Sequence, residues 1–214
     1  MDTKALFDAV VNGEEEAVVA GVQAALAEGQ APEAILNGTL IPAMREVGRL
    51  FEIKEYYIPE MLLAANSMQA GVAVLQPLLA SAGAPPAGRV TMGTVKGDLH
   101  DIGKNLVILM LQGAGFQVTD LGVDVPPERF VQAAKDGSQI IGLSAMITTT
   151  MPNMEGVIQA LQAAGVREQV KVMVGGAPLR QDYADEIGAD GFAPDANAAV
   201  RVASQLVAAL ATPA

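Results

Sequence analysis

The sequence predicts an α/β protein in which a helical bundle precedes a doubly wound parallel sheet. Three observations predict this class. Apolar residues recur at helical spacing up to about residue 79, Gly and Pro interrupt the pattern at 81–88, and short apolar runs then alternate with helical segments. The chain has 214 residues, of which 51% are hydrophobic, so it is long enough to bury a core.

Four helical patterns make up the first part. A short one ends at Gly13, and a second, amphipathic one is stopped by Gly29. Pro32 is well placed to open a third, which we expect to bend near Pro42, and Pro59 starts the fourth. Helices joined by such short connections predict a small bundle.

The segment 81–88 has two adjacent prolines and no periodic apolar pattern, which is typical of a semi-rigid linker between domains. We therefore expect a helical domain at 1–82, a linker at 83–88 and a second domain at 89–214.

The second domain alternates strands with helices. We expect strands at 89–95, 116–121, 139–144, 171–174 and 191–193. We expect helices at 103–112, 126–135, 151–164, 180–187 and 197–210. This alternation predicts a five-stranded, doubly wound parallel sheet. No G-x-G-x-x-G follows the first strand, and Asn105 stands where a P-loop needs Ser or Thr, which argues against dinucleotides and ATP.

Composition narrows the partners and the compartment. The net charge is −11 and the thirteen basic residues are scattered singly, which argues against a nucleic-acid partner. The absence of cysteine excludes disulfides and thiolate metal sites and suits a cytosolic protein. The first residues lack a basic region followed by an apolar one, and no charge-free run approaches eighteen apolar residues. We expect a soluble, cytoplasmic protein with no membrane segment.

His100 is the only histidine, and it follows the first expected strand, at the sheet edge where α/β proteins bind ligands. Asp98 can accept a hydrogen bond from one ring nitrogen and so aim the other outward, as in metal sites. Gly103 allows a bulky group to approach closely. Taken alone, the histidine also fits an ordinary loop imidazole hydrogen-bonded to Asp98 or Asp101.

Two further loops leave the same edge of the expected sheet. The first carries hydroxyl groups that can reach a ligand or Asp98, although alone it favours a helix N-terminus capped by Thr149 or Thr150. The second contains Gly175 and Gly176, which remove side chains from a strand end, as in a tight turn or a ligand groove.

The loop between the third and fourth helices gathers Phe51, Tyr56, Tyr57 and Ile58, beyond what the periodicity of the bundle requires. These side chains either complete the end of the bundle or cover a ligand held by the second domain.

Together, the Asp-x-His-x-x-Gly sequence, the two loops and the helical first part resemble the cobalamin-binding module of corrinoid-dependent methyltransferase systems. The resemblance spans nearly the whole chain and implies a helical cap, a linker and a flavodoxin-like domain. It implies that cobalamin or a related corrinoid binds base-off/His-on, with His100 replacing the cofactor's dimethylbenzimidazole as lower cobalt ligand. Asp98 would bond the other ring nitrogen, Thr150 would extend this chain, and Gly103 would make room for the displaced nucleotide tail.

The other site residues implied by the resemblance form two groups. In the second domain, the implied cofactor-binding residues are Asp101, Ser144, Met146, Thr148, Gly175 and Gly176. Met146 stands where leucine is usual, which leaves the detailed shape of the tail groove open. In the helical domain, the resemblance implies that Phe51, Ile58 and Met61 shield the upper face of the corrin.

The resemblance implies a methyl carrier that is not a complete enzyme alone. Co(I) would accept a methyl group from a substrate-specific methyltransferase, and methyl-Co(III) would pass it to a second methyltransferase with a tetrahydrofolate or thiol acceptor. A reductive activator is a third implied partner. The cap would have to leave the corrin when a partner docks, with the linker as the hinge.

Other classes stay open. A cobalamin-binding subunit of an adenosylcobalamin-dependent mutase would need a catalytic barrel from another chain, and a cobalamin-responsive regulator would need a DNA-binding segment that is not recognisable here. A zinc hydrolase would need more ligands than one histidine and no cysteine supply. The methyl donor is open among methylamines, methanol, methoxylated aromatics and betaines.

Overall fold

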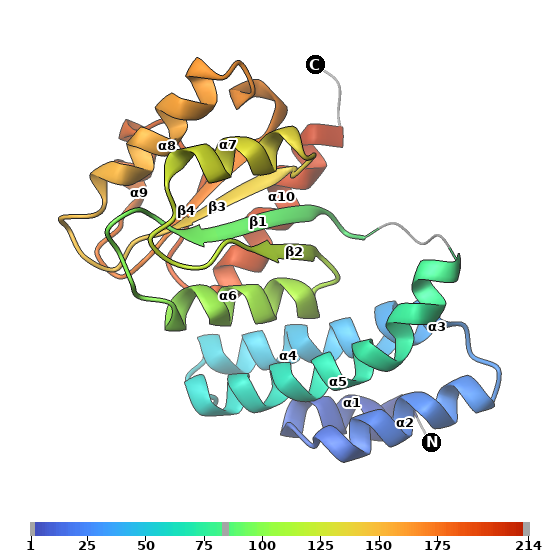
Figure 1. The fold of residues 1–214 in the computed structure, drawn as a ribbon. Coiled ribbons are helices and arrows are strands. Elements are labelled where there is room, and N and C mark those ends of the chain that lie inside the picture. Colours follow the sequence, from blue (N-terminus) through green and yellow to red (C-terminus); the bar gives the residue numbers. More distant parts are fainter. Residues whose placement is uncertain (1–2, 83–85, 212–214) are drawn as a thin grey trace. The chain divides into compact units, whose positions relative to one another are not determined.

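The computed structural model describes residues 3–82 and 86–211 (Figure 1). The chain divides into two compact units: unit 1 comprises Met1–Pro86 with Gln112–Gly115, and unit 2 comprises Ala87–Leu111 with Phe116–Ala214. Half of the linker expected at 83–88 lies outside the described residues, so the expected domain boundaries stay a prediction.

Unit 1 is helical, as the periodicity predicts. Its elements are α1 (Thr3–Asn12), α2 (Glu15–Ala27), α3 (Pro32–Ile35), a π-helical turn (Leu36–Leu40), α4 (Ile41–Glu52) and α5 (Ile58–Ala82). Val10, Val18 and Val22 are fully buried in its core. Gly71 of α5 permits close packing there, because a Cβ at this position would lie 2.8 Å from Cγ1 of Val18.

The bend expected near Pro42 takes the form of the π-helical turn just before it. The backbone N–H of Ile41 donates to the carbonyl of Leu36, five residues back. Proline has no N–H, and in a regular α-helix its ring clashes with the carbonyl four residues back. One extra residue in the preceding turn therefore lets the chain continue as α4.

Helix α5 is the one described helix that is long and apolar enough to cross a membrane by length and composition, over Ile58–Leu79. This length was not expected from the sequence, because uncharged polar residues such as Ser67 interrupt the apolar run. Ser67 is buried, and its hydroxyl donates to the carbonyl of Ala64 at 2.8 Å. Packing against α1, α2 and α4 buries part of this apolar surface, whereas Leu63 and Leu78 are exposed.

Unit 2 is the five-stranded parallel sheet that the sequence predicts. Its strands are β1 (Arg89–Thr94), β2 (Gln117–Asp120), β3 (Ile140–Ser144), β4 (Lys171–Gly175) and β5 (Gly191–Ala193). They lie in the order β2-β1-β3-β4-β5, and each neighbouring pair is parallel. This is the flavodoxin-like order, so the predicted fold class is confirmed.

Helices cover both faces of this sheet (Figure 1). They are α6 (Ile102–Gly113), α7 (Pro127–Lys135), α8 (Pro152–Ala163), α9 (Gln181–Glu186) and α10 (Ala196–Ala211), with a 3₁₀ turn at Arg167–Gln169. One face packs against α7, α8 and α9, and the other against α6 and α10. Phe130 of α7 is fully buried over Gly93, where a Cβ would lie 2.8 Å from its ring. The core thus holds β1 rigidly beneath the loop that follows it.

Candidate functional site

The candidate site lies where β1 and β3 end side by side. After β1 the chain enters α6, and after β3 it enters α8, on opposite faces of the sheet. At such a switch point the two loops diverge and leave a crevice outside the carboxyl ends of the strands. The topology therefore places the loop that carries His100 next to the loop after β3.

Asp98 joins these two loops. Its side chain is buried, at 1% exposure. Oδ1 accepts hydrogen bonds from the backbone N–H of His100 at 3.1 Å and from Nδ1 of its ring at 2.7 Å. Oδ2 accepts from the backbone N–H of Met146 at 2.8 Å and from Oγ1 of Thr150 at 2.7 Å.

Burial works to raise the pKa of Asp98, but the hydrogen bonds from Met146, Thr150 and His100 together hold that pKa well below its usual range. The carboxylate is therefore ionised at neutral pH. An ionised carboxylate accepts only, so the proton of the His100 ring lies on Nδ1 and the lone pair on Nε2.

His100 presents that lone pair outward. Its side chain is 56% exposed, and within the described residues Nε2 has no hydrogen-bond partner. The backbone of His100 is held as well as its ring, because the hydroxyl of Thr94 donates to the carbonyl of His100 at 2.8 Å. The site thus combines a fixed tautomer with a free, aimed nitrogen donor.

The side chain of Thr150 donates a hydrogen bond to Asp98 and does not cap the following helix. Its hydroxyl lies 2.7 Å from Oδ2 of Asp98 and 2.9 Å from the carbonyl of Ile147. The single hydroxyl proton favours the charged acceptor. The alternative that Thr149 or Thr150 caps the next helix is wrong, because α8 has Met151 at its N-cap and no side-chain cap.

Two residues that were not expected from the sequence, Asp124 and Asn153, hold the histidine loop in place. Oδ1 of Asp124 accepts from the backbone N–H of Gly97 at 2.7 Å, and the N–H of Asp124 donates to the carbonyl of Asp98 at 2.9 Å. Nδ2 of Asn153 donates to the carbonyl of Lys96 at 2.7 Å. Strand order could have indicated Asp124, because β2 pairs with β1 and so brings the loop after β2 beside the histidine loop.

The other expected residues of unit 2 occupy the same edge with different surroundings. Asp101 accepts hydrogen bonds from Asn105, at its carbonyl and its carboxylate, and so organises the start of α6. Gly103 faces open space, because a Cβ there would meet nothing within 4 Å. Ser144 ends β3, and Thr148 is exposed in the loop after it.

The glycine pair after β4 has a packing cause. Gly176 adopts φ +140°, and a Cβ on it would lie 1.8 Å from the carbonyl oxygen of Ala145. A Cβ on Gly175 would lie 3.0 Å from the carbonyl of Ala193. Gly176 therefore lets the turn after β4 approach the loop after β3, which is the tight-turn reading of this pair.

Large apolar side chains are exposed in the two loops of the site. Leu99 and Ile102 are 73% and 78% exposed, and Met146 and Ile147 are 48% and 41% exposed. Of these four residues, only Met146 was expected at the site from the sequence. Exposed apolar groups around a polar centre are typical of a surface that binds a large apolar ligand or a partner.

The three expected shielding residues belong to unit 1. Phe51 is half-buried near the end of α4, Ile58 opens α5 with 49% exposure, and Met61 is fully buried. Of the other aromatic side chains in this loop, Tyr56 donates to the carbonyl of Val11 at 3.2 Å, so it completes the bundle. Tyr57 is exposed.

The donor set limits the kind of metal that this site can hold. Among the described residues, no three His, Cys, Asp or Glu side chains gather in a group suited to a metal ion. His100 therefore offers one nitrogen, which fits a metal that brings its other ligands with it, as in a macrocycle. It does not fit the three or four protein ligands of a zinc enzyme.

Comparison with known proteins agrees with this geometry. Two family models match the chain, each described as a B12 binding domain, one over residues 88–202 and the other over residues 3–76. Dimethylamine corrinoid protein 1 of Methanosarcina acetivorans is 46% identical over 205 residues, which cover 95% of this chain and 96% of that protein.

Two solved structures are similar over both parts of the chain. A cobalamin-binding protein from Desulfitobacterium hafniense is 32% identical, with a TM-score of 0.80 over 96% of this chain and 98% of that one. The methanol:cobalamin methyltransferase complex of Methanosarcina barkeri contains a chain that is 30% identical, with a TM-score of 0.84 over 96% of this chain and 79% of that one.

Proposed function

Because this chain belongs to the family of B12-binding corrinoid proteins, we propose that it carries methyl groups between two methyltransferases on a bound corrinoid. One observation supports this most directly: a buried carboxylate fixes one nitrogen of a single imidazole and leaves the other free at the carboxyl edge of the sheet. The corrinoid, when bound, supplies a strongly nucleophilic cobalt that takes up and gives up a methyl group.

We assign the role of lower cobalt ligand to Nε2 of His100, so that the cofactor binds base-off/His-on. The free lone pair and the fixed ring support this assignment. Asp98 holds the ring at Nδ1, and Thr150 holds Asp98 in place.

The rest of the edge would receive the macrocycle and its tail. The open space at Gly103 admits a group that a side chain would exclude, and Asp101 keeps the first turn of α6 in place. Exposed apolar side chains such as Met146 offer a surface for the corrin. We assign the groove for the nucleotide tail to Ser144 and Thr148.

We place the glycine pair, Gly175 and Gly176, at the wall of the same groove. We also retain the cap assignment, in which Phe51, Ile58 and Met61 shield the corrin and the segment 83–88 acts as the hinge. The exposure of Ile58 supports a role toward a ligand, whereas the burial of Met61 supports a role in shaping that surface.

Methylamines are the donor class that the relatives favour. Dimethylamine and trimethylamine corrinoid proteins of Methanosarcina acetivorans are 46% and 43% identical to this chain, against 30% for the chain of the methanol complex. We therefore infer a methylamine-specific methyltransferase as the first partner. A methyltransferase for the acceptor and a reductive activator complete the proposed partners, all in the cytoplasm, with no nucleic acid or membrane involved.

Labelling of the single histidine tests the ligand assignment. The full chain is reconstituted anaerobically with cobalamin, once with natural histidine and once with ¹⁵N-histidine, and the cobalt(II) state is examined by electron paramagnetic resonance. If Nε2 of His100 is the lower ligand, the nitrogen splitting changes from three lines to two. An unchanged pattern shows that the benzimidazole is still coordinated and overturns the assignment.

Substitution provides the second arm. His100→Ala should shift the visible spectrum of the bound corrinoid and weaken its binding. Lys96→Ala, which removes an exposed side chain from the same loop, should change neither. Failure of the wild-type chain to bind any corrinoid would overturn the proposed function as a whole.

A further inference from the structure

A second hollow in unit 2 lies away from the histidine loop. It is a groove of about 440 Å³ on the α7 side of the sheet, lined by residues of β1, β2, α7 and the turn before β3. Arg89 is the first residue of β1 and Ser138 precedes β3, so the groove reaches the amino end of these strands. His100 follows the carboxyl end, and no residue of the candidate site lines the groove.

The groove exists because β2 is an edge strand that α7 does not cover. Helix α7 packs over β1 and β3, which leaves this face of β2 open. Gln117 and Thr119 alternate along β2 and therefore point to the same side, and both line the groove and are exposed. An edge strand with polar side chains and an open face provides hydrogen-bonding groups for a small polar ligand.

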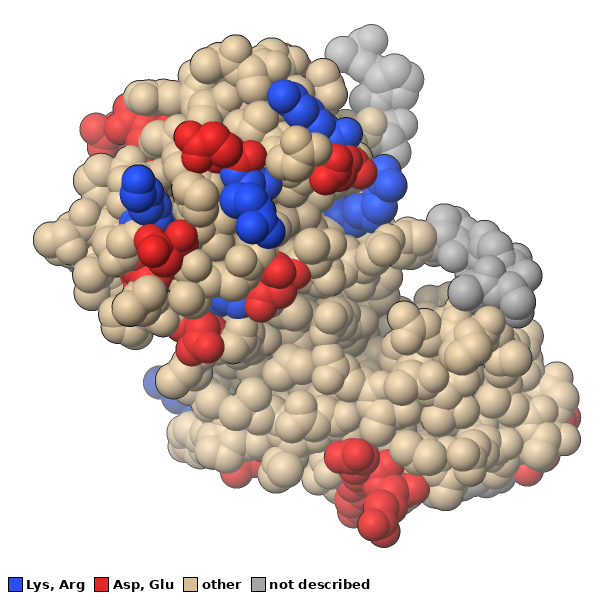
Figure 2. Space-filling model, in the orientation of Figure 1, with Lys and Arg blue, Asp and Glu red and all other residues tan. Residues whose placement is uncertain are grey.

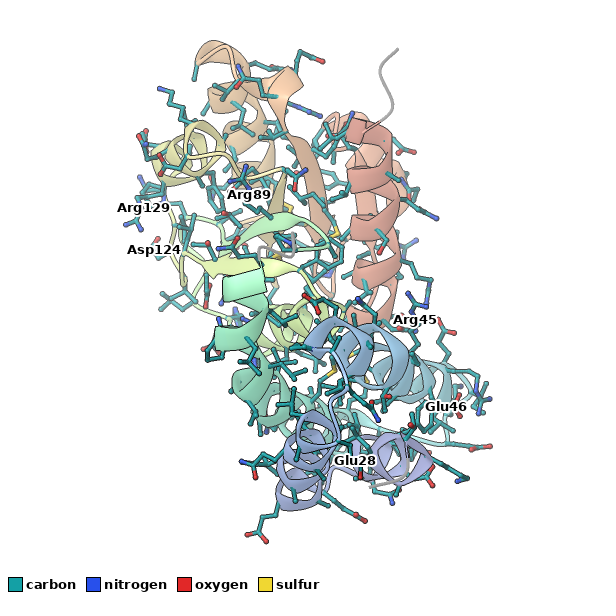
Figure 3. All side chains as sticks on the ribbon, turned by 90° about the vertical axis from the view of Figure 1, so that its right-hand side faces the viewer. Glu28, Arg45, Glu46, Arg89, Asp124 and Arg129 are labelled. Atoms are coloured by element: carbon teal, nitrogen blue, oxygen red, sulfur yellow. The ribbon has the colours of Figure 1, made fainter. Side chains whose placement is uncertain are left out.

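Two arginines from different elements line the groove, and Figure 3 labels both of them. Arg89 comes from β1 and Arg129 from α7, and within the described residues neither side chain makes a hydrogen bond or ion pair. Gly137, with φ +94°, makes room for the first of them, since a Cβ there would lie 2.9 Å from Nη2 of Arg89. The one acidic lining residue, Asp136, accepts instead from Gln132 at 2.7 Å.

Positive charge does not dominate the visible surface of unit 2 as a whole. On the visible face of unit 2, basic side chains are interspersed with acidic ones (Figure 2). The chain as a whole has a net charge of −11. Two arginines that line one groove and form no ion pair within the described residues therefore favour an anionic ligand over a cationic or apolar one.

A pair of hydroxyl groups adds a donor. Oγ1 of Thr91 and Oγ of Ser138 lie 2.6 Å apart, and Thr91 is 2% exposed. The two groups carry two protons, but the bond between them uses only one. The other hydroxyl proton is therefore available to an acceptor in the groove.

We propose that this groove binds a small organic dianion, held at its phosphate or carboxylate oxygens by Arg89 and Arg129. The guanidinium fork matches both kinds of oxyanion, and amides and hydroxyls remain for the rest of the molecule. The volume lies in the lower part of the range of ligand pockets, which suits a phosphorylated or dicarboxylic metabolite. The inference does not depend on the corrinoid site.

Binding is tested with inorganic phosphate and with succinate, each titrated into the ¹⁵N-labelled full chain with its corrinoid bound. The amide signals of Thr119, Gly137 and Ser138 should shift saturably. Arg89→Gln and Arg129→Gln should each weaken binding about tenfold, as expected for a lost charged hydrogen bond. Lys135→Gln makes the same change in net charge on α7 outside the groove and should leave the affinity unchanged.

The two probes distinguish the possible ligand classes. Saturation by phosphate alone identifies a phosphate ester as the ligand class, and saturation by succinate alone identifies a dicarboxylate. The proposal is wrong if neither probe saturates below about 10 mM, or if Lys135→Gln weakens binding as much as the arginine variants do.

Discussion

Two aspartates at opposite ends of one sheet show how the surroundings of a carboxylate determine its use. Before β5, Asp190 accepts from Arg167 at 2.8 Å, Lys171 at 3.1 Å and the backbone N–H of Val172 at 2.7 Å. After β1, Asp98 accepts, among the described residues, only from backbone N–H groups, a hydroxyl and an imidazole.

The two aspartates differ in whether a cation neutralises the negative charge of the carboxylate. Cations neutralise Asp190, and the result is a clamp that joins β4 to the turn before β5. Neutral donors hold Asp98 in place without cancelling its charge, so the charge still acts on the imidazole beside it. A carboxylate that ends in an ion pair serves structure, whereas one held by neutral groups serves the side chain that it orients.

The largest test of this comparison is Asp98→Ala. Removal of the carboxylate leaves the backbone N–H of Met146 and the ring Nδ1–H of His100 without a hydrogen-bond acceptor. It also leaves a cavity where the buried carboxylate was. We expect the free energy of unfolding of the corrinoid-free chain to fall by about 3 kcal/mol, measured by urea denaturation. Corrinoid affinity should fall with it. A loss below about 1 kcal/mol would mean that water replaces the carboxylate.

Asp190→Ala sharpens the comparison from the other end. The two cations are partly exposed and can turn to solvent, so we expect a loss of about 1–2 kcal/mol in the free energy of unfolding. The visible spectrum and the affinity of the bound corrinoid should match those of wild type. A change in that spectrum would break the distinction between structural and orienting carboxylates.

Acid provides the third test. The pKa of Asp98 is lower in the folded chain than in the unfolded one, where it is near 3.9. Its ionised form therefore contributes stability that is fully present above about pH 4 and is lost as the pH falls further, toward the folded pKa. In the corrinoid-free chain, Asp98→Asn should flatten the fall in unfolding free energy below pH 4. Equal slopes for both proteins would contradict the low pKa.

Thr150→Val has a smaller expected effect. It removes one neutral donor from Asp98 and keeps the shape of the side chain, so the unfolding free energy should fall by about 1 kcal/mol. Thr150→Ser should restore most of the loss because it restores the hydroxyl. If the serine variant is as unstable as the valine variant, packing of the methyl group rather than the hydrogen bond explains Thr150.

Gly103→Ala has the smallest expected effect on stability. The position lies in the first turn of α6 and faces open space, so a methyl group should leave the unfolding free energy unchanged or raise it by about 0.5 kcal/mol. Corrinoid affinity, measured on the same protein, should fall if the open space admits part of the cofactor. Unchanged affinity would remove Gly103 from the site.

The sequence predicted the architecture because its signals are local. Apolar periodicity and Gly or Pro punctuation located all five strands within two residues, and alternation made the sheet parallel. β1 ends one residue earlier than expected, since Val95 makes only an isolated bridge with Val125. The π-helical turn was not predictable in form, because Pro42 requires a disruption without specifying which kind.

Site prediction was limited by contacts between segments distant in sequence. The pairing of Asp98 with His100 spans two residues, so it was readable. The contact of Asp124 with Gly97 spans 27 residues and depends on strand order and on a positive φ at Asp124. The exposure of Ile102 likewise reflects where α6 begins relative to the sheet, which periodicity does not report.

Position 146 reaches Asp98 through its main chain and not through its side chain. Any residue except proline has the backbone N–H that makes this contact. The side chain at position 146 therefore does not affect how Asp98 is held. Methionine can therefore replace leucine at this position, and single substitutions can change the apolar surface of this edge while the pairing of Asp98 with His100 stays intact.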